Sequence, residues 1–418
     1  MSRFDGQALV SGKTRLRGAD RDDAADASRF FSRMGYVSLG VGAPVGVVVH
    51  PLALFVIFSI GIALILLAAA LDAKPGFVNR VLVPFRVPAF LALLAGLAWA
   101  TLSILWTPYP VSAAQHVLKL ALLIAATLCA VAAPRDNAAA TDLYLFPIGV
   151  TLLMATIAAK GLSHILAGVP DDGTLACGAV ALAVLLFPAL GGLTSRARNG
   201  YARLLLILAL AFAYMDGYAP LTVALFAGYL ALSFSISDMK RTARELAWGG
   251  AGLVLLSPLI PAVAPTVAAW VFHTKLARVP PPYASLSVAA DVFTHDKLRL
   301  ITGHGFETVA RSMRDMILPP QTPRALAFTV WYELGIVGAV VAAAGLWFAF
   351  RGLERAPPRL APFMAAGLTA VVALAFLNVD FDDMTGLTLI AVAVISTDMA
   401  ARSQYRTTRP SAASLANL

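Results

Sequence analysis

Charged residues are scarce in this chain. They make up 13% of the 418 residues, against about 25% in a typical soluble protein. Hydrophobic residues reach 59%, and the mean hydropathy is +0.78. Apolar runs of roughly 18 residues or more, each long enough to cross a bilayer as a helix, recur along the sequence. The composition excludes an ordinary soluble protein and predicts an all-α, polytopic membrane protein.

Cysteine and the common catalytic signatures are also scarce. The two cysteines, Cys129 and Cys177, both lie in apolar runs, so we expect small core residues and no disulfide framework. The sequence has no Gly-rich nucleotide-binding loop, no Ser-His-Asp signature and no Cys-His pair. Its histidines and acidic residues follow no familiar metal-ligand spacing. We therefore expect neither a cofactor nor a metal.

The apolar runs predict about twelve transmembrane helices. They lie near residues 36–50, 52–71, 87–106, 115–133, 142–160, 174–192, 201–215, 218–236, 247–272, 326–350, 359–378 and 384–401. This pattern predicts a mobile tail over 1–34, nine helices within 35–272, a large loop over 273–325, three helices within 326–401 and a second tail over 402–418. Because residues 1–34 are charged and lack an apolar core, we expect no cleaved signal peptide there.

Basic segments alternate with neutral or acidic ones. Lys and Arg occur within 74–86, at 135, and within 196–203, 240–244, 351–359 and 402–409. The segments between them, "TPYPVSAAQ", "VPDDG", "MDGYAP" and "NVDFDDM", hold no Lys or Arg. This is the positive-inside pattern, which places both termini in the cytoplasm. The net charge of +9 thus reflects topology, and we infer no nucleic-acid partner from it.

The predicted outside loop, 273–325, departs from that rule. It holds seven basic and four acidic residues and three of the six histidines. Two of its stretches, "SLSVAADVFTHDKLRLI" and "GFETVARSMRDMI", have the apolar periodicity of amphipathic helices. In the second, Phe306, Val309, Met313 and Met316 share one face. We expect these helices to lie on the outer leaflet and to cap a cavity among the spans.

Three stretches give the chain a resemblance to a known family. They are "LAWATLSILWTPYPVSAAQHVLKLALLIAA", "LITGHGFETVARS" and "PRALAFTVWYELGIVGAVVAAAG". In order, spacing and placement around a large outer loop, they resemble the O-antigen ligase and polysaccharide polymerase superfamily. The family usually has His-Asn where this chain has Arg324-Ala325. It often has Ser-Arg-Gly where this chain has "MDGYAPL".

The resemblance implies a membrane glycosyltransferase. Such an enzyme transfers or polymerises a glycan from a polyprenyl-diphosphate carrier at the periplasmic face of the bacterial inner membrane. Its partners would be the lipid-linked glycan, the bilayer and polysaccharide assembly proteins. The two altered positions favour an alternative, a non-catalytic member that binds lipid-linked glycan or a polysaccharide export machine. A transporter is a third alternative, but the sequence shows no internal repeat of the kind many transporters have.

Transfer from a lipid diphosphate requires cations that stabilise the leaving group. Arg324, nine residues before Glu333 at the start of a predicted helix, is the first candidate, and an interfacial anchor is the alternative. Arg311, Arg314 and Arg299 are further candidates, although Arg311 could simply pair with Glu307 at i,i+4 on a solvated face.

The acceptor hydroxyl requires a base or close positioning. His304 lies between two glycines in "GHGF", where backbone can approach a ligand closely, and imidazole titrates in a useful range. Glu333 is a carboxylate within an apolar helix, which is either functional or held by hydrogen bonds in a structural role. We predict His304 and Glu333 as catalytic candidates.

Overall fold

A computed structural model describes residues 24–72, 76–133, 142–168, 173–260, 299–319, 322–377 and 384–403, with the single residues 263 and 270. The regular structure of these residues is entirely helical, without a β-strand, so the predicted all-α fold is confirmed. The first helical segment begins at Ala24 and runs to Val49. It includes the π-helical turn η1 (Ser38–Gly42) and α2 (Ala43–Val49).

The remaining elements follow in chain order. They are α3 (Pro51–Asp72), α4 (Phe77–Leu82), η2 (Val83–Arg86), α5 (Pro88–Ser103), α6 (Pro110–Ala132), η3 (Asp142–Tyr144), α7 (Leu145–Ala167), α8 (Thr174–Ser195), α9 (Asn199–Asp216), α10 (Ala219–Ser237), α11 (Met239–Leu256), α14 (Arg299–Thr302), α15 (Thr308–Arg314), α16 (Leu326–Gly352), η5 (Leu353–Arg355), α17 (Ala361–Phe376) and α18 (Met384–Ser403). Each of the twelve predicted spans coincides with one of these helices over most of its described length.

The helices are those of a multi-pass membrane protein. In the described part of the chain, eight are long and apolar enough to cross a bilayer, or nine if the segments 77–86 and 88–103, bent by 84°, form one span. α17 is apolar but shorter, and α9 and α11 are not among the eight. The predicted number of twelve spans therefore stays a prediction.

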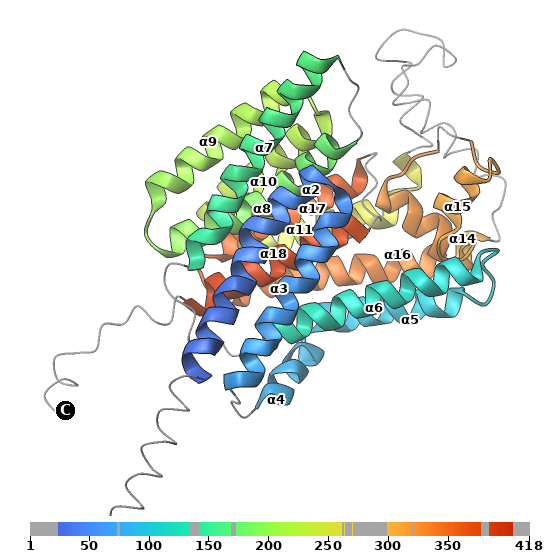
Figure 1. Ribbon diagram of the computed structural model, residues 1–418. Helices are drawn as coiled ribbons and strands as arrows, with labels where there is room; N and C mark the ends of the chain where they lie inside the picture. The colour runs from blue at the N-terminus through green and yellow to red at the C-terminus, as the bar shows by residue number, and fades with distance from the viewer. Residues whose placement is uncertain are drawn as a thin grey trace, which may run out of the picture.

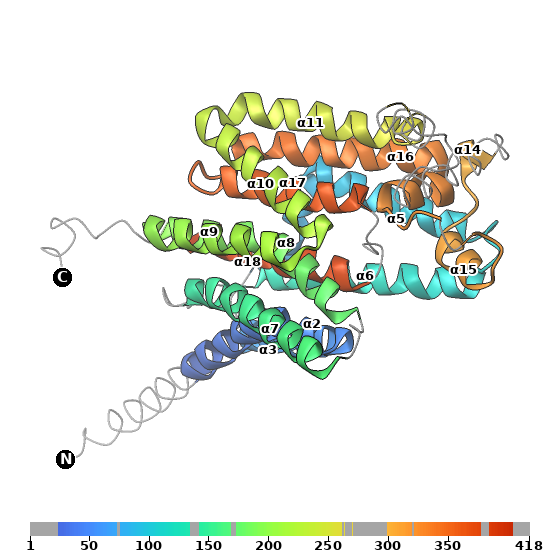
Figure 2. The ribbon, with the colours of Figure 1, turned by 90° about the horizontal axis from the view of Figure 1, so that it is seen from above.

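The helices form a bundle with two distinct ends (Figure 1). The described chain begins and ends at one end of the bundle, and α14 and α15 lie at the opposite end in both views (Figures 1 and 2). Seen from above, α11 and α16 form one outer layer, and α2, α3 and α7 form the other (Figure 2). The residues that follow α5 and those that precede α16 thus meet at the end that carries α15.

The bundle is organised around α8. Its residues from Gly178 to Leu193 are all buried, and it contacts α7, α17 and α18. Small residues let these neighbours approach, as helix packing in membranes requires; Gly178, for example, lies against Val48 and Ile157. A second unit joins α16 to α5 and α11, and Trp331 Nε1 donates to the Val254 carbonyl at 2.8 Å.

Two sequence predictions need correction. The expected tail over 1–34 is wrong for residues 24–34, which are helical; this helix packs on α3, where the buried Ser28 hydroxyl donates to the Ala68 carbonyl. The amphipathic helix expected around 305–317 is shorter, since α15 spans only Thr308–Arg314. Met316, which was expected on its apolar face, lies beyond the end of the helix and is 80% exposed. Val309 packs against Phe328 and Tyr332 of α16. This side chain is therefore buried against another helix, whereas the sequence predicted that it would face the outer leaflet. Most of the other expected loop helix, including His295, lies outside the described residues.

Candidate functional site

The sequence predicts α16 as a continuous helix, but it is broken near its start. Gly335 has φ 64° and ψ −160°, a conformation that a residue with a side chain rarely adopts. The break interrupts the helical hydrogen-bond ladder and releases carbonyl groups that need donors, particularly in an apolar environment. The site is built around this break.

Three donors from distant segments bind the carbonyls at the break. The backbone N–H of His304 donates to the Tyr332 carbonyl at 2.9 Å, and that of Gly305 donates to the Glu333 carbonyl at 3.0 Å. Trp99 Nε1, on α5, donates to the Leu334 carbonyl at 2.9 Å. The segment 303–305 thus completes the hydrogen bonding of a broken membrane helix.

Glycines make this close approach feasible. Gly303 and Gly305 both have positive φ, 79° and 99°. A Cβ at Gly303 would overlap the Glu333 carbonyl oxygen, and one at Gly305 would lie 2.5 Å from Thr107 Cα. The "GHG" motif is therefore explained by packing against α16 and the α5–α6 connection.

Glu333 holds residues 307–309, which follow the "GHG" motif, by hydrogen bonds. Its side chain is only 3% exposed. Its two carboxylate oxygens accept hydrogen bonds from the backbone N–H groups of Glu307, at 2.9 Å, and Val309, at 2.8 Å. Hydrogen bonds to a charged acceptor contribute about 1.5–3 kcal/mol each. In this geometry the carboxylate holds the start of α15.

The α5–α6 connection binds the loop from the other side. Ser103 Oγ accepts from the Phe306 N–H at 3.1 Å, and Thr107 Oγ1 donates to the Phe306 carbonyl at 2.9 Å. Nearer solvent, the Tyr109 hydroxyl donates to Asp315 at 2.7 Å. This hydrogen bond is the main cause that raises the pKa of Tyr109 above its ordinary value. The loop is thus held between α5, α6 and α16.

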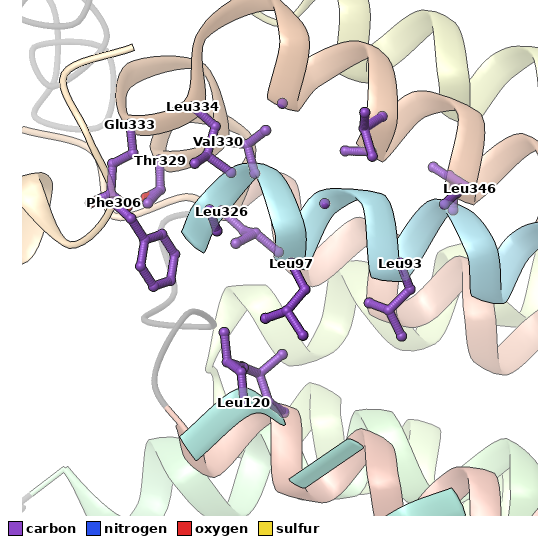
Figure 3. A pocket seen from close by; sticks show the side chains of 18 of the residues that line it. Leu93, Leu97, Leu120, Phe306, Leu326, Thr329, Val330, Glu333, Leu334 and Leu346 are labelled. Carbon is purple, nitrogen blue, oxygen red and sulfur yellow. The ribbon is translucent and has the colours of Figure 1, made fainter. Parts of the chain in front are cut away.

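A cavity of about 520 Å³, which we call the groove, runs from this loop along α5, α6 and α16. Its lining is almost wholly apolar. Figure 3 shows Leu93 and Leu97 of α5 directed toward Leu120 of α6, with Phe306 near one end and Leu346 toward the other. On α5 the lining runs from Ala89 to Ala100, which corresponds to roughly 16 Å of helix. Leu93 is 50% exposed, so the groove opens at the outer surface of the bundle.

Polar groups gather at the end of the groove beside the loop. His116 of α6, Glu307, Thr329 and Glu333 belong to the lining there. His116 Nδ1 lies 3.0 Å from Glu307 Oε2, and the His116 ring packs edge-on against Phe306. Ser112 Oγ is 3.5 Å and Arg311 Nε 3.8 Å from Glu307 Oε1. We call His116, Glu307, Ser112 and Arg311 the polar cluster.

The predicted site residues are only partly brought together. Glu333 lines the groove, and Arg311 lies in the polar cluster and also borders a smaller hollow with Tyr109 and Gln115. His304 stacks on Tyr332, with ring centroids 3.9 Å apart, and its Nδ1 is 3.0 Å from the Tyr332 carbonyl.

The other three arginines, Arg299, Arg314 and Arg324, are exposed and do not belong to the groove lining. The i,i+4 proximity expected for Glu307 and Arg311 is confirmed. The Glu307 side chain is only 16% exposed, however, so it does not lie on a solvated face.

Sequence reasoning did not assign a role to the α5–α6 residues. Trp99, Ser103, Thr107 and His116 all contact the loop or the break. All four occur in the first of the three stretches that carry the family resemblance. The feature of the sequence that could have identified them is the cluster of polar side chains around a short turn between two apolar runs.

Comparisons with protein-family models, curated proteins and solved structures gave no match. The resemblance therefore rests on the three stretches themselves. These stretches do lie together, since α5–α6, residues 303–315 and the start of α16 form one unit. Within the described residues, no three His, Cys, Asp or Glu side chains are grouped so as to hold a metal ion.

Proposed function

We propose that the protein is a membrane glycosyltransferase of the O-antigen ligase and polymerase type. It would act on a glycan linked to a polyprenyl diphosphate, at the periplasmic face of a bacterial inner membrane. The reaction occurs at the bundle end that carries α15. The chain termini then lie in the cytoplasm, as the positive-inside pattern predicts.

The observation that carries the proposal is the groove with its polar end. A polyprenyl-linked glycan has a long apolar tail and a strongly polar head. The groove offers an apolar path beside the lipid-facing surface and ends at His116, Glu307 and Arg311. Burial of each methylene contributes about 0.8 kcal/mol, so a tail along this path supplies affinity while the head stays at the polar cluster.

The diphosphate requires cations, and the groove end itself is not strongly basic. Two of its lining residues, Glu307 and Glu333, are acidic. We therefore assign the diphosphate to the solvent side of the polar cluster, next to Arg311, with Arg299, Arg314 and Arg324 as further contacts. The Glu333 carboxylate holds the loop and takes no part in proton transfer in this assignment.

One observation favours a non-catalytic binding protein as the second candidate. His304, the predicted loop base, stacks on Tyr332 and directs Nδ1 at a backbone carbonyl. If no other base serves, the site binds lipid-linked glycan without transfer. A partner role in polysaccharide assembly would follow.

The test combines genetics with a purified reaction. Deletion of the gene is expected to shorten or remove a surface polysaccharide and to accumulate its lipid-linked precursor. Protein in nanodiscs is then incubated with undecaprenyl diphosphate bearing a fluorescent oligosaccharide, with and without rough lipopolysaccharide as acceptor. Release of undecaprenyl diphosphate with growth of the acceptor supports transfer. Binding without release supports the second candidate, and neither binding nor release contradicts both.

A further inference from the structure

We propose that His116, oriented by Glu307, is the general base of this site. The inference rests on the proposed function and adds to it the group that accepts the proton of the acceptor hydroxyl. The resemblance of the sequence points to the outer loop for that base, whereas this pair joins α6 to the loop across the end of the groove.

For a neutral His116 imidazole, the contact with Glu307 selects the tautomer that a base requires. An ionised carboxylate can only accept hydrogen bonds, so the Nδ1 that lies 3.0 Å from Glu307 Oε2 carries the proton. The other nitrogen, Nε2, then has the lone pair that a base requires. Both side chains are largely buried, at 18% and 16% exposure, and both line the groove.

Glu307 is held in this position at a conformational cost. Its φ of 68° places it in the left-handed region, which disfavours residues with a side chain. Its N–H is bound by Glu333, and the neighbouring Phe306 is bound by Ser103 and Thr107. Strained residues that their surroundings hold in place concentrate at functional sites. A glycine would adopt this backbone conformation more easily, yet this position carries the carboxylate that contacts His116.

The proposed step is a displacement at the anomeric carbon of the glycan. The acceptor hydroxyl oxygen forms the new bond to that carbon, and its proton passes to His116 Nε2. The bond from the anomeric carbon to the diphosphate oxygen breaks, and its electron pair leaves with the diphosphate. Glu307 stabilises the imidazolium that forms, and the proton is later released to water or to the departing diphosphate. No oxidant, reductant or metal is needed for this balance.

The test uses His116→Gly with added imidazole. In the nanodisc reaction with labelled undecaprenyl-diphosphate oligosaccharide and rough lipopolysaccharide, His116→Gly is expected to lower kcat about 100- to 10,000-fold, the range for loss of a general base. KM should change little. Free imidazole should restore part of the rate in His116→Gly. The control is His50→Gly, in the exposed α2–α3 connection, which should keep wild-type kcat and show no imidazole effect.

Glu307→Gly provides a second variant that does not depend on rescue. Because glycine relieves the positive φ, this variant should remain as thermally stable as the wild type while its kcat falls at least about tenfold. If the wild type transfers glycan but His116→Gly retains its kcat, the base assignment is wrong and the proposed function stands. The base assignment is equally wrong if His116→Gly loses activity through folding and Glu307→Gly is fully active. Absence of transfer and of lipid-linked glycan binding by the wild type overturns both proposals.

Discussion

At the scale of single residues, the site depends on three glycines, Gly303, Gly305 and Gly335, whose positive φ other residues rarely adopt. The sequence indicated that the backbone of "GHG" could approach a ligand closely, and it predicted an uninterrupted helix over 326–350. The structure brings the two together, with Gly303 and Gly305 packed on the break at Gly335. Periodicity predicts where a helix runs. It cannot predict that a loop more than 25 residues earlier in the sequence supplies donors to a break in that helix.

This packing makes a direct prediction for Gly303→Ala. The new methyl group would overlap the Glu333 carbonyl oxygen and force the loop away from α16. We expect a destabilisation of about 3–5 kcal/mol, within the range of severe steric substitutions, measured by thermal or denaturant unfolding in detergent. Gly217→Ala is the matched control, since Gly217 has a similar positive φ of 69° and nothing within 4 Å. It should lose only about 1–2 kcal/mol. Equal losses for the two variants would contradict the packing argument.

At the scale of elements, the unit that matters is the loop 303–315 held between α5–α6 and α16. The sequence predicted the start of α16 and an amphipathic segment before it, and both are present. It did not predict the length of α15 or the break in α16, because both depend on tertiary hydrogen bonds. Glu333 illustrates the point. Its position in an apolar helix predicted either a functional or a structural role, and only the structure shows that its carboxylate accepts from the N–H groups of Glu307 and Val309.

Removal of that carboxylate should release the start of α15. In Glu333→Ala, the amides of Glu307 and Val309 lose their acceptors, and each bond contributes about 1.5–3 kcal/mol. Hydrogen exchange of peptides covering 305–310 is therefore expected to accelerate roughly 10- to 100-fold, as measured by mass spectrometry. Glu245→Ala, which removes an exposed carboxylate on α11, should leave this exchange unchanged. Unaltered exchange in Glu333→Ala would show that other contacts hold the loop.

At the scale of the whole molecule, composition predicted the class of fold most reliably. Low charge and repeated apolar runs require helices that satisfy their own backbone in lipid, and the all-α multi-pass bundle follows. The number of spans is less determined, since α9, α11 and α17 are helical but shorter or less apolar than the others. The groove could not be predicted, because its lining joins the consecutive helices α5 and α6 to α16, which lies far later in the chain.

The orientation of the bundle can be tested with single cysteines in a background lacking Cys129 and Cys177. Met316→Cys, exposed after α15, should react with a membrane-impermeant maleimide applied to spheroplasts. Lys240→Cys, exposed at the start of α11, should react only after permeabilisation, because its segment belongs to the predicted inside. The reverse labelling pattern would invert the topology and move the site to the cytoplasmic face.

The central claim is that the groove binds the lipid tail of a polyprenyl-diphosphate glycan. It is tested best by comparing the affinity of the wild type for this ligand with that of a variant whose groove is filled. Ala342 lines the groove, whereas Val340, on the same helix, is exposed and does not belong to the lining.

Wild type, Ala342→Phe and Val340→Phe in nanodiscs would be titrated with undecaprenyl diphosphate bearing a fluorescent oligosaccharide, after thermal unfolding has shown that all three are folded. A phenyl ring that displaces two or more methylenes should weaken binding by at least about tenfold. We predict this loss for Ala342→Phe alone. Failure of the wild type to bind, or equal affinity of all three proteins, would contradict the account.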